Sequence, residues 1–205
     1  MTNFFPNNSE ITFEEFLKSY MERLRSSSEL LDIKKAISII EVLVDNIKSG
    51  GTIFTCGNGG SAAIADHFVC DLVKGTSSDS KLNPKAIPLL MTPLLTATAN
   101  DISYDEIFSF PLSKFGREGD ILLSVSSSGN SANIIKAIEM AKKLKLISIS
   151  FVGFDGGKAN VISDYSLHIP SDNYGICEDA HHVLMHVISQ FIRLTSIDDK
   201  SKLGN

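Results

Sequence analysis

Two helical patterns begin the chain, before any pattern typical of a strand. The segment Thr12-Phe13-Glu14-Glu15 has the sequence of a capping box, which predicts a helix that runs to about Ser26. A second helix is predicted after Asp32, because apolar side chains recur every three or four residues along one stripe. The positions of this stripe are Ile33, Ile37, Ile40, Val44 and Ile47. Gly50-Gly51 predicts the end of this helix, so residues 1–50 form a predicted N-terminal helical arm.

After residue 50 the pattern changes to short apolar runs that alternate with amphipathic stretches. The predicted strands are 52–55, 86–91, 120–125, 146–152 and 165–169, and the predicted helices are 61–73, 131–144 and 176–194. Apolar runs without strict alternation are typical of parallel strands covered by helices on both faces. We therefore expect a three-layer α/β domain over residues 51–197. A polar loop is predicted at 76–84 and a frayed tail at 198–205.

The composition of the 205-residue chain narrows the classes of function. Apolar residues make up 43% of the chain, and 19 Lys and Arg against 24 Asp and Glu give a net charge of −5. No basic cluster is longer than Lys142-Lys143, so nucleic-acid binding is disfavoured. The apolar runs are too short to span a membrane, and the first residues lack the features of a signal peptide. The widely spaced Cys56, Cys70 and Cys177 favour a reducing cytoplasm.

Two loops that follow predicted strands have an unusual composition. Residues 56–61 read Cys-Gly-Asn-Gly-Gly-Ser, and residues 126–131 read Ser-Ser-Ser-Gly-Asn-Ser. Ligands of open parallel sheets bind at the carboxyl ends of the strands, where glycine-lined backbone, hydroxyls and a helix N-terminus suit a phosphate dianion. The alternative is that both loops only cap helices, but two such loops favour a phosphorylated ligand. Gly57, Gly59 and Ala62 fit a loose dinucleotide fingerprint that lacks its acidic residue, so no nucleotide cofactor is expected.

Histidines and carboxylates at helical spacing supply candidate chemistry. His67 and Asp71 are four residues apart on one predicted helix, and Glu178, His182 and His186 recur every four residues on the last one. Such side chains on facing helices can build a metal site, and the same residue types can transfer protons at a carbonyl substrate. A partly buried structural histidine is the alternative for any one of them. Four of the five histidines lie in these two short helices, which favours a site.

Four motifs of the chain occur together in one known family. They are Gly57-Asn58-Gly59-Gly60-Ser61-Ala62-Ala63 with His67-Phe68, then Leu95-Thr96-Ala97-Thr98-Ala99-Asn100-Asp101, then Gly119-Asp120 with Ser126-Ser127-Ser128-Gly129-Asn130-Ser131-Ala132-Asn133, and Asp155-Gly156-Gly157-Lys158. Through them the chain resembles the sugar isomerase (SIS) domain of phosphoheptose isomerases over nearly its whole length. The resemblance implies a flavodoxin-like, five-stranded sheet. It also implies conversion of sedoheptulose 7-phosphate to D-glycero-D-manno-heptose 7-phosphate through an enediol, for lipopolysaccharide or capsule biosynthesis.

The same resemblance implies site residues, an assembly and a metal. It suggests a homotetramer with active sites between subunits, and zinc as a possible cofactor. The implied catalytic residues are Asp71, His186 and Glu178, and the implied metal-contact residues are His67, Asp71, Glu178 and His186. The implied substrate-binding residues are Asn58, Gly59, Gly60, Ser61, Asn100, Asp101, Ser126, Ser127, Ser128 and Ser131. Without the resemblance, the Asn100-Asp101 pair is equally consistent with an ordinary turn.

Two positions depart from the pattern of the family. Asp71 stands where the family usually has Glu, and Glu178 stands where it usually has Gln. A shorter base reaches less far, whereas the added charge of Glu178 could strengthen a metal site or move the base to the other helix. The alternative function is a non-catalytic SIS protein, such as a sugar-phosphate sensor or a tetrameric partner of the bacterial replication initiator. His67 and His186 favour the enzyme, a sugar-phosphate isomerase, because a scaffold has no use for them.

Overall fold

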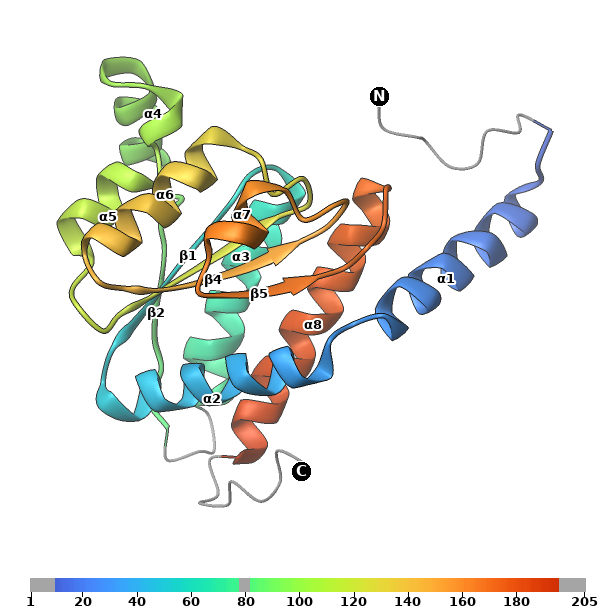
Figure 1. Cartoon of the computed structure of the whole chain (residues 1–205), viewed down its shortest axis with the longest axis horizontal. Helices are drawn as coiled ribbons and strands as arrows, with labels where there is room; N and C mark the ends of the chain where they lie inside the picture. Colours follow the sequence, from blue (N-terminus) through green and yellow to red (C-terminus); the bar gives the residue numbers. More distant parts are fainter. Residues whose placement is uncertain (1–9, 78–81, 196–205) are drawn as a thin grey trace.

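A five-stranded parallel sheet forms the centre of the protein in the computed structural model, which describes residues 10–77 and 82–195 (Figure 1). The strands are β1 (Thr52–Gly57), β2 (Lys85–Pro88), β3 (Ile121–Ser126), β4 (Ile147–Val152) and β5 (Tyr165–His168). They are ordered β2-β1-β3-β4-β5, and every neighbouring pair is parallel. This is the strand order of flavodoxin-like folds, so the predicted α/β class and the number of strands are confirmed.

Helices cover both faces of the sheet. One face carries α2 (Ile33–Ser49), α3 (Gly60–Cys70) and α8 (Tyr174–Thr195), and the other carries α5 (Ser109–Phe115), α6 (Ala132–Lys143) and α7 (Gly157–Ile162). The buried apolar side chains accordingly form two clusters, one on each side of the strands. Burial on both faces explains why the strand sequences show continuous apolar runs rather than strict alternation.

The N-terminal arm consists of the two expected helices. Thr12 forms the predicted capping box at the start of α1 (Phe13–Glu29): its hydroxyl accepts from the Glu15 N–H at 3.3 Å, and its own N–H donates to Glu15 at 2.9 Å. Gly50 ends α2 in a left-handed conformation, with φ at 78°. Helix α1 extends away from the sheet and contacts α8, which leaves much of its surface uncovered by this chain (Figure 1).

The buried face of α2 is rotated relative to the predicted stripe. Ile40, Val44 and Ile47 are buried as expected, whereas Ile33 is 68% exposed. Ile39 and Leu43, which the stripe omitted, are fully buried; the face of α2 that packs against the protein is therefore wider than the stripe and centred on these neighbouring positions.

Three short helices are absent from the sequence prediction. They are α4 (Thr92–Asp101), α5 and α7. Helix α4 is rich in threonine, which has a weak helix propensity, so its pattern did not stand out. The ordinary-turn alternative for Asn100-Asp101 is wrong, because both residues lie within the end of α4.

Two predicted boundaries are also wrong. The second strand ends at Pro88 rather than Met91. The predicted helix 61–73 ends as an α-helix at Cys70 and continues as a π-helical segment, η1 (Asp71–Thr76).

Residues 78–81 of the predicted loop and the tail 198–205 lie outside the described residues. None of the described helices is long and apolar enough to cross a membrane.

Asp120 fixes the edge of the sheet opposite the carboxyl ends of the strands. Its buried carboxylate accepts from the Thr52 N–H at 2.8 Å and from the Arg117 N–H at 2.9 Å.

We expect Asp120→Ala to lower the free energy of unfolding by about 3 kcal/mol, because two backbone donors lose their partner. Asp120→Asn should lower it less, since the amide retains one acceptor oxygen. Urea unfolding followed by circular dichroism measures both changes. An alanine variant as stable as the wild type would contradict this role.

Candidate functional site

The centre of the sheet contains a topological switch between β1 and β3. The chain leaves β1 for α3 on one face and leaves β3 for α6 on the other face. Gly57 pairs with Val125 at the ends of the two strands, so the loops that follow emerge side by side. Ligands of open α/β sheets bind in the crevice that such a divergence creates.

A cavity of about 190 Å³ lies in this crevice, and we call it the serine cavity. It is lined by Asn58, Ser61, Val125, Ser126, Ser127, Ser128, Ser131, Tyr174 and Glu178. The structure therefore brings together six of the ten substrate-binding candidates, from two loops that are far apart in the sequence. Glu178 and Tyr174 reach the same cavity from the N-terminal end of α8.

The remaining substrate-binding candidates lie outside the lining of this cavity. Gly59 and Gly60 lie at the start of α3 in the same loop as Asn58. Asn100 and Asp101 are exposed at the end of α4, where the Asn100 amide donates to the Asp101 carboxylate at 2.7 Å.

The hydroxyls of the serine loop suit an oxyanion better than a capping role. Ser131 is the N-cap residue of α6, yet its side chain makes no capping hydrogen bond, and α3 likewise has none at Gly59. The Ser127 hydroxyl is buried without a hydrogen-bond partner among the described residues. Ser128 accepts from the Asn130 N–H at 3.3 Å, which leaves its O–H available to donate. Side-chain capping therefore does not account for these loops, and their donors fit a phosphate dianion.

Glu178 forms the wall of the serine cavity next to α3. A Cβ at Gly60 would displace the Glu178 carboxylate, which packs closely against this glycine. Burial, together with the charge of Asp179, raises the pKa of Glu178, and a hydrogen bond from the Ser61 backbone opposes this shift. The carboxylate thus lies at the N-terminus of α3, where the helix dipole favours a negative charge.

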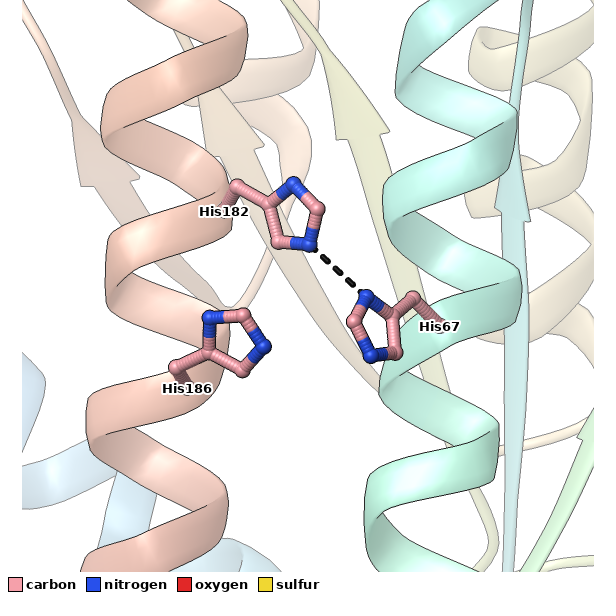
Figure 2. Close-up of side chains that lie close together, drawn as sticks. All are labelled: His67, His182 and His186. Carbon is pink, nitrogen blue, oxygen red and sulfur yellow. Dashed lines mark hydrogen bonds between the residues drawn. The ribbon is translucent and has the colours of Figure 1, made fainter.

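A cluster of three histidines lies further along α8, and Figure 2 shows how their rings face one another. His67 projects from α3 toward His182 and His186 on α8, and the His67 Nδ1 is 2.8 Å from the His182 Nε2. One nitrogen from each of the three rings lies within 4.8 Å of the others. We call these three residues the histidine cluster.

Asp71 lies next to two members of the histidine cluster, His67 and His186. Its two carboxylate oxygens lie 3.6 Å from the His67 Nε2 and 3.7 Å from the His186 Nε2. The Ser189 hydroxyl donates to Asp71 at 3.1 Å, and Thr76 at the end of η1 donates to the Ser189 carbonyl at 3.2 Å. Asp71 is the first residue of η1, and π-helical turns in α-helices commonly occur at functional sites.

The donors of this group fit a divalent metal ion. Imidazole nitrogen and carboxylate oxygen are the ligands that zinc commonly takes from proteins. Burial and the neighbouring His186 and His67 lower the pKa of His182, which favours the neutral ring that can bind a metal. The three histidines can therefore form a metal site, with Asp71 as an adjacent oxygen donor.

The predicted site residues thus fall into two groups in one chain. His67, Asp71 and His186 come together, whereas Glu178 lies with the serine cavity and next to Ser61. His186 follows Glu178 by eight residues of α8, which is about 12 Å along a helix.

Sequence reasoning gave no role to several residues that the geometry places in these groups. They are Ser189, Tyr174 and Asn133. No local pattern marked these three residues, since their contacts come from distant elements. His182 lies in the histidine cluster, and its four-residue spacing to His186 had already made it a candidate.

Comparisons with known proteins identify the family of the chain and agree with its fold. The SIS domain family matches residues 12–153. A phosphoheptose isomerase of Clostridium acetobutylicum is 33% identical over 193 residues, which cover 90% of this chain and 98% of the relative. One of Helicobacter pylori is 37% identical over 183 residues, which cover 87% of this chain and 92% of the relative. The structure of a phosphoheptose isomerase from Francisella tularensis superposes with a TM-score of 0.81 at 28% identity, covering 88% of this chain and 96% of that one.

Inorganic phosphate tests the serine cavity without any assumption about a reaction. We expect phosphate to raise the melting temperature in a concentration-dependent way, and Ser128→Ala to weaken this binding about fivefold, because one hydroxyl donor is lost. Ser113→Ala is the control. The Ser113 hydroxyl donates to the Phe110 carbonyl on α5, so its loss should leave the phosphate affinity unchanged. Equal phosphate affinity in Ser128→Ala and the wild type would rule out this contact.

Proposed function

The chain belongs to the phosphoheptose isomerase family of SIS domain proteins, and on this premise we propose that it is an aldose–ketose isomerase of a phosphorylated C7 sugar. The proposed reaction converts sedoheptulose 7-phosphate to D-glycero-D-manno-heptose 7-phosphate, a precursor for lipopolysaccharide or capsule. The observation that carries the proposal is the approach of Asp71 to His186, a carboxylate beside an imidazole on facing elements. An aldose–ketose conversion needs this pair, because one proton moves between carbons and another between oxygens.

The serine cavity holds the phosphate in this proposal. Hydroxyls from Ser126 to Ser131 donate to the phosphate oxygens, and the uncapped N-terminus of α6 favours their negative charge. Binding energy from this unreactive end orients the carbonyl end of the sugar. Glu178 contacts sugar hydroxyls from the wall of the same cavity rather than taking part in proton transfer.

Asp71 and His186 carry out the two proton transfers. Asp71 removes a proton from C1, while His186 donates a proton to the carbonyl oxygen on C2, which gives the enediol. His186 then accepts the proton of the C1 hydroxyl, and Asp71 returns its proton to C2, so that no atom or electron is gained or lost overall. Ser189 holds the Asp71 carboxylate at 3.1 Å, and η1 fixes its position against α8, which offsets the shorter reach of Asp relative to Glu.

The histidine cluster supports a zinc site in the same proposal. His67, His182 and His186 would hold the ion, with Asp71 as a further donor. A bound zinc ion would supply Lewis-acid polarisation of the substrate carbonyl in place of the proton from His186, because an imidazole nitrogen that binds the ion cannot also carry a proton.

A homotetramer with active sites between subunits is the proposed assembly. Three apolar side chains on one face of α1 support it: Phe13, Leu17 and Met21 are 78%, 48% and 55% exposed. Val183 and Val187 on α8 are also exposed, on the helix that carries Glu178 and His186. Covering these side chains with a second copy would bury apolar surface next to the helix that carries the site residues. The cysteines are all unpaired, which fits the proposed cytoplasmic location.

Turnover of sedoheptulose 7-phosphate, followed by NMR or by coupled mass spectrometry, tests the proposed reaction. We expect Asp71→Asn and His186→Ala to lower kcat by about 1000-fold, because each removes a proton-transfer group. Glu178→Gln should mainly raise KM and lower kcat less than tenfold.

The outcome also separates the enzyme from a non-catalytic SIS protein. Sugar-phosphate binding by the wild type without turnover of any C6 or C7 phosphate, with or without zinc, would remove the proposed reaction. A larger loss of kcat in Glu178→Gln than in Asp71→Asn would instead move the base to α8.

Metal affinity tests the proposed ligands independently of turnover. We expect the metal-stripped protein to bind zinc, and His182→Ala to weaken its affinity by about 10- to 100-fold, because a nitrogen ligand is lost. Glu178→Gln should bind zinc within twofold of the wild type, since its carboxylate lies at the serine cavity. Competition with a chromogenic chelator measures both. The reverse ranking of the two variants would place Glu178, and not His182, in the metal site.

A further inference from the structure

A pair of asparagine amides joins the two ligand loops beneath the serine cavity. The Asn58 amide donates to the Asn133 Oδ1 at 2.9 Å, and the Asn133 amide donates back to the Asn58 Oδ1 at 2.9 Å. Asn58 follows β1 and lines the cavity, whereas Asn133 lies in the first turn of α6 and is 2% exposed. We call this pair the amide clasp. It spans the switch point, where the two strands diverge.

A backbone N–H fixes the orientation of both side-chain amides in the clasp, that is, which end of each amide carries the oxygen. The Ile134 N–H donates to the Asn133 Oδ1 at 2.9 Å, and a backbone N–H can only donate. The oxygen of Asn133 must therefore face this donor and the nitrogen of Asn58, which turns the oxygen of Asn58 toward the Asn133 nitrogen. The Tyr104 hydroxyl, 3.4 Å away, lies on the same oxygen of Asn58.

This arrangement leaves Asn58 with one free polar group toward the ligand. Its oxygen accepts from Asn133 and lies beside Tyr104, which occupies both lone pairs. Its nitrogen carries two hydrogens, and only one of them is used in the hydrogen bonds of the described residues. The second N–H belongs to a side chain that lines the serine cavity.

We propose that Asn133 is a positioning residue that makes Asn58 a fixed hydrogen-bond donor to an oxygen of the sugar, not to the phosphate. The inference rests on the proposed function for the identity of the ligand. The proposed phosphate donors lie on the serine loop after β3, whereas Asn58 lines the same cavity from the loop after β1. A fixed N–H donor binds a lone pair of a sugar oxygen and accepts no bond from a sugar hydroxyl.

A double-mutant cycle tests whether Asn133 acts through Asn58. We expect Asn133→Ala and Asn58→Ala each to weaken binding of sedoheptulose 7-phosphate, measured as Kd by calorimetry and as KM in the turnover assay, by about 5- to 10-fold. The double variant should bind no worse than Asn58→Ala, because the clasp has no effect once its target is gone. The affinity for inorganic phosphate should stay within twofold of the wild type in all three variants.

Asn46→Ala is the matched control for loss of a buried amide. Asn46 is 5% exposed and donates to the Gly119 carbonyl at 2.8 Å, at the edge of the sheet away from the cavity. It should lower the melting temperature without changing Kd or KM. An Asn133→Ala variant that behaves like this control is purely structural and overturns the inference, as do multiplicative effects in the double variant.

Phosphate affinity and turnover separate the sugar contact from the other possibilities. A parallel loss of affinity for inorganic phosphate in Asn133→Ala would assign the Asn58 donor to the phosphate and overturn the proposed sugar contact. A wild type that binds the sugar phosphate with a clasp-dependent Kd but does not turn it over would retain the clasp and remove only the proposed reaction.

Discussion

The divergence of the chain at the ends of β1 and β3 is the constraint on which the candidate site depends. Two neighbouring parallel strands send their connections to opposite faces, so nothing from the sheet itself fills the space between the loops. Two helix N-termini point into this space, and neither is capped by its own side chain. The glycines and serines of the loops follow from this geometry, because a ligand must approach the backbone closely and find donors there.

Helix α8 links this crevice to the residues of the proposed proton transfer. It presents Glu178 to the serine cavity and, one and two turns later, His182 and His186 to α3. A rigid helix sets the distance between these groups at about 1.5 Å per residue, so the serine cavity, the proposed phosphate site, and the histidine cluster are held apart by a fixed length. This separation suits an extended phosphorylated sugar, and the change to π-helical geometry at Asp71 brings a carboxylate to the far end of it.

Much of this arrangement was predictable from local patterns. The capping box at Thr12, the glycine at the end of α2 and the apolar runs of the five strands are signals carried by adjacent residues, and each was confirmed. The threonine-rich helix α4 was missed because weak propensity and short length gave no periodic signal. The rotated face of α2 was missed for a different reason: which side of a helix is buried depends on what packs against it, and Ile33 remains 68% exposed.

The sequence alone determined the fold class, the two ligand loops and the residue types of the chemistry, because hydrophobic periodicity and glycine or serine content act over a few neighbouring positions. Only the tertiary structure decided which side chains meet. It put His182 with His67, left Glu178 at the serine cavity, turned Asp71 toward Ser189, and paired Asn58 with Asn133. The two residues of each pair, His67–His182, Asp71–Ser189 and Asn58–Asn133, are more than 70 positions apart. Such a contact depends on how helices pack across a sheet, which no local pattern encodes.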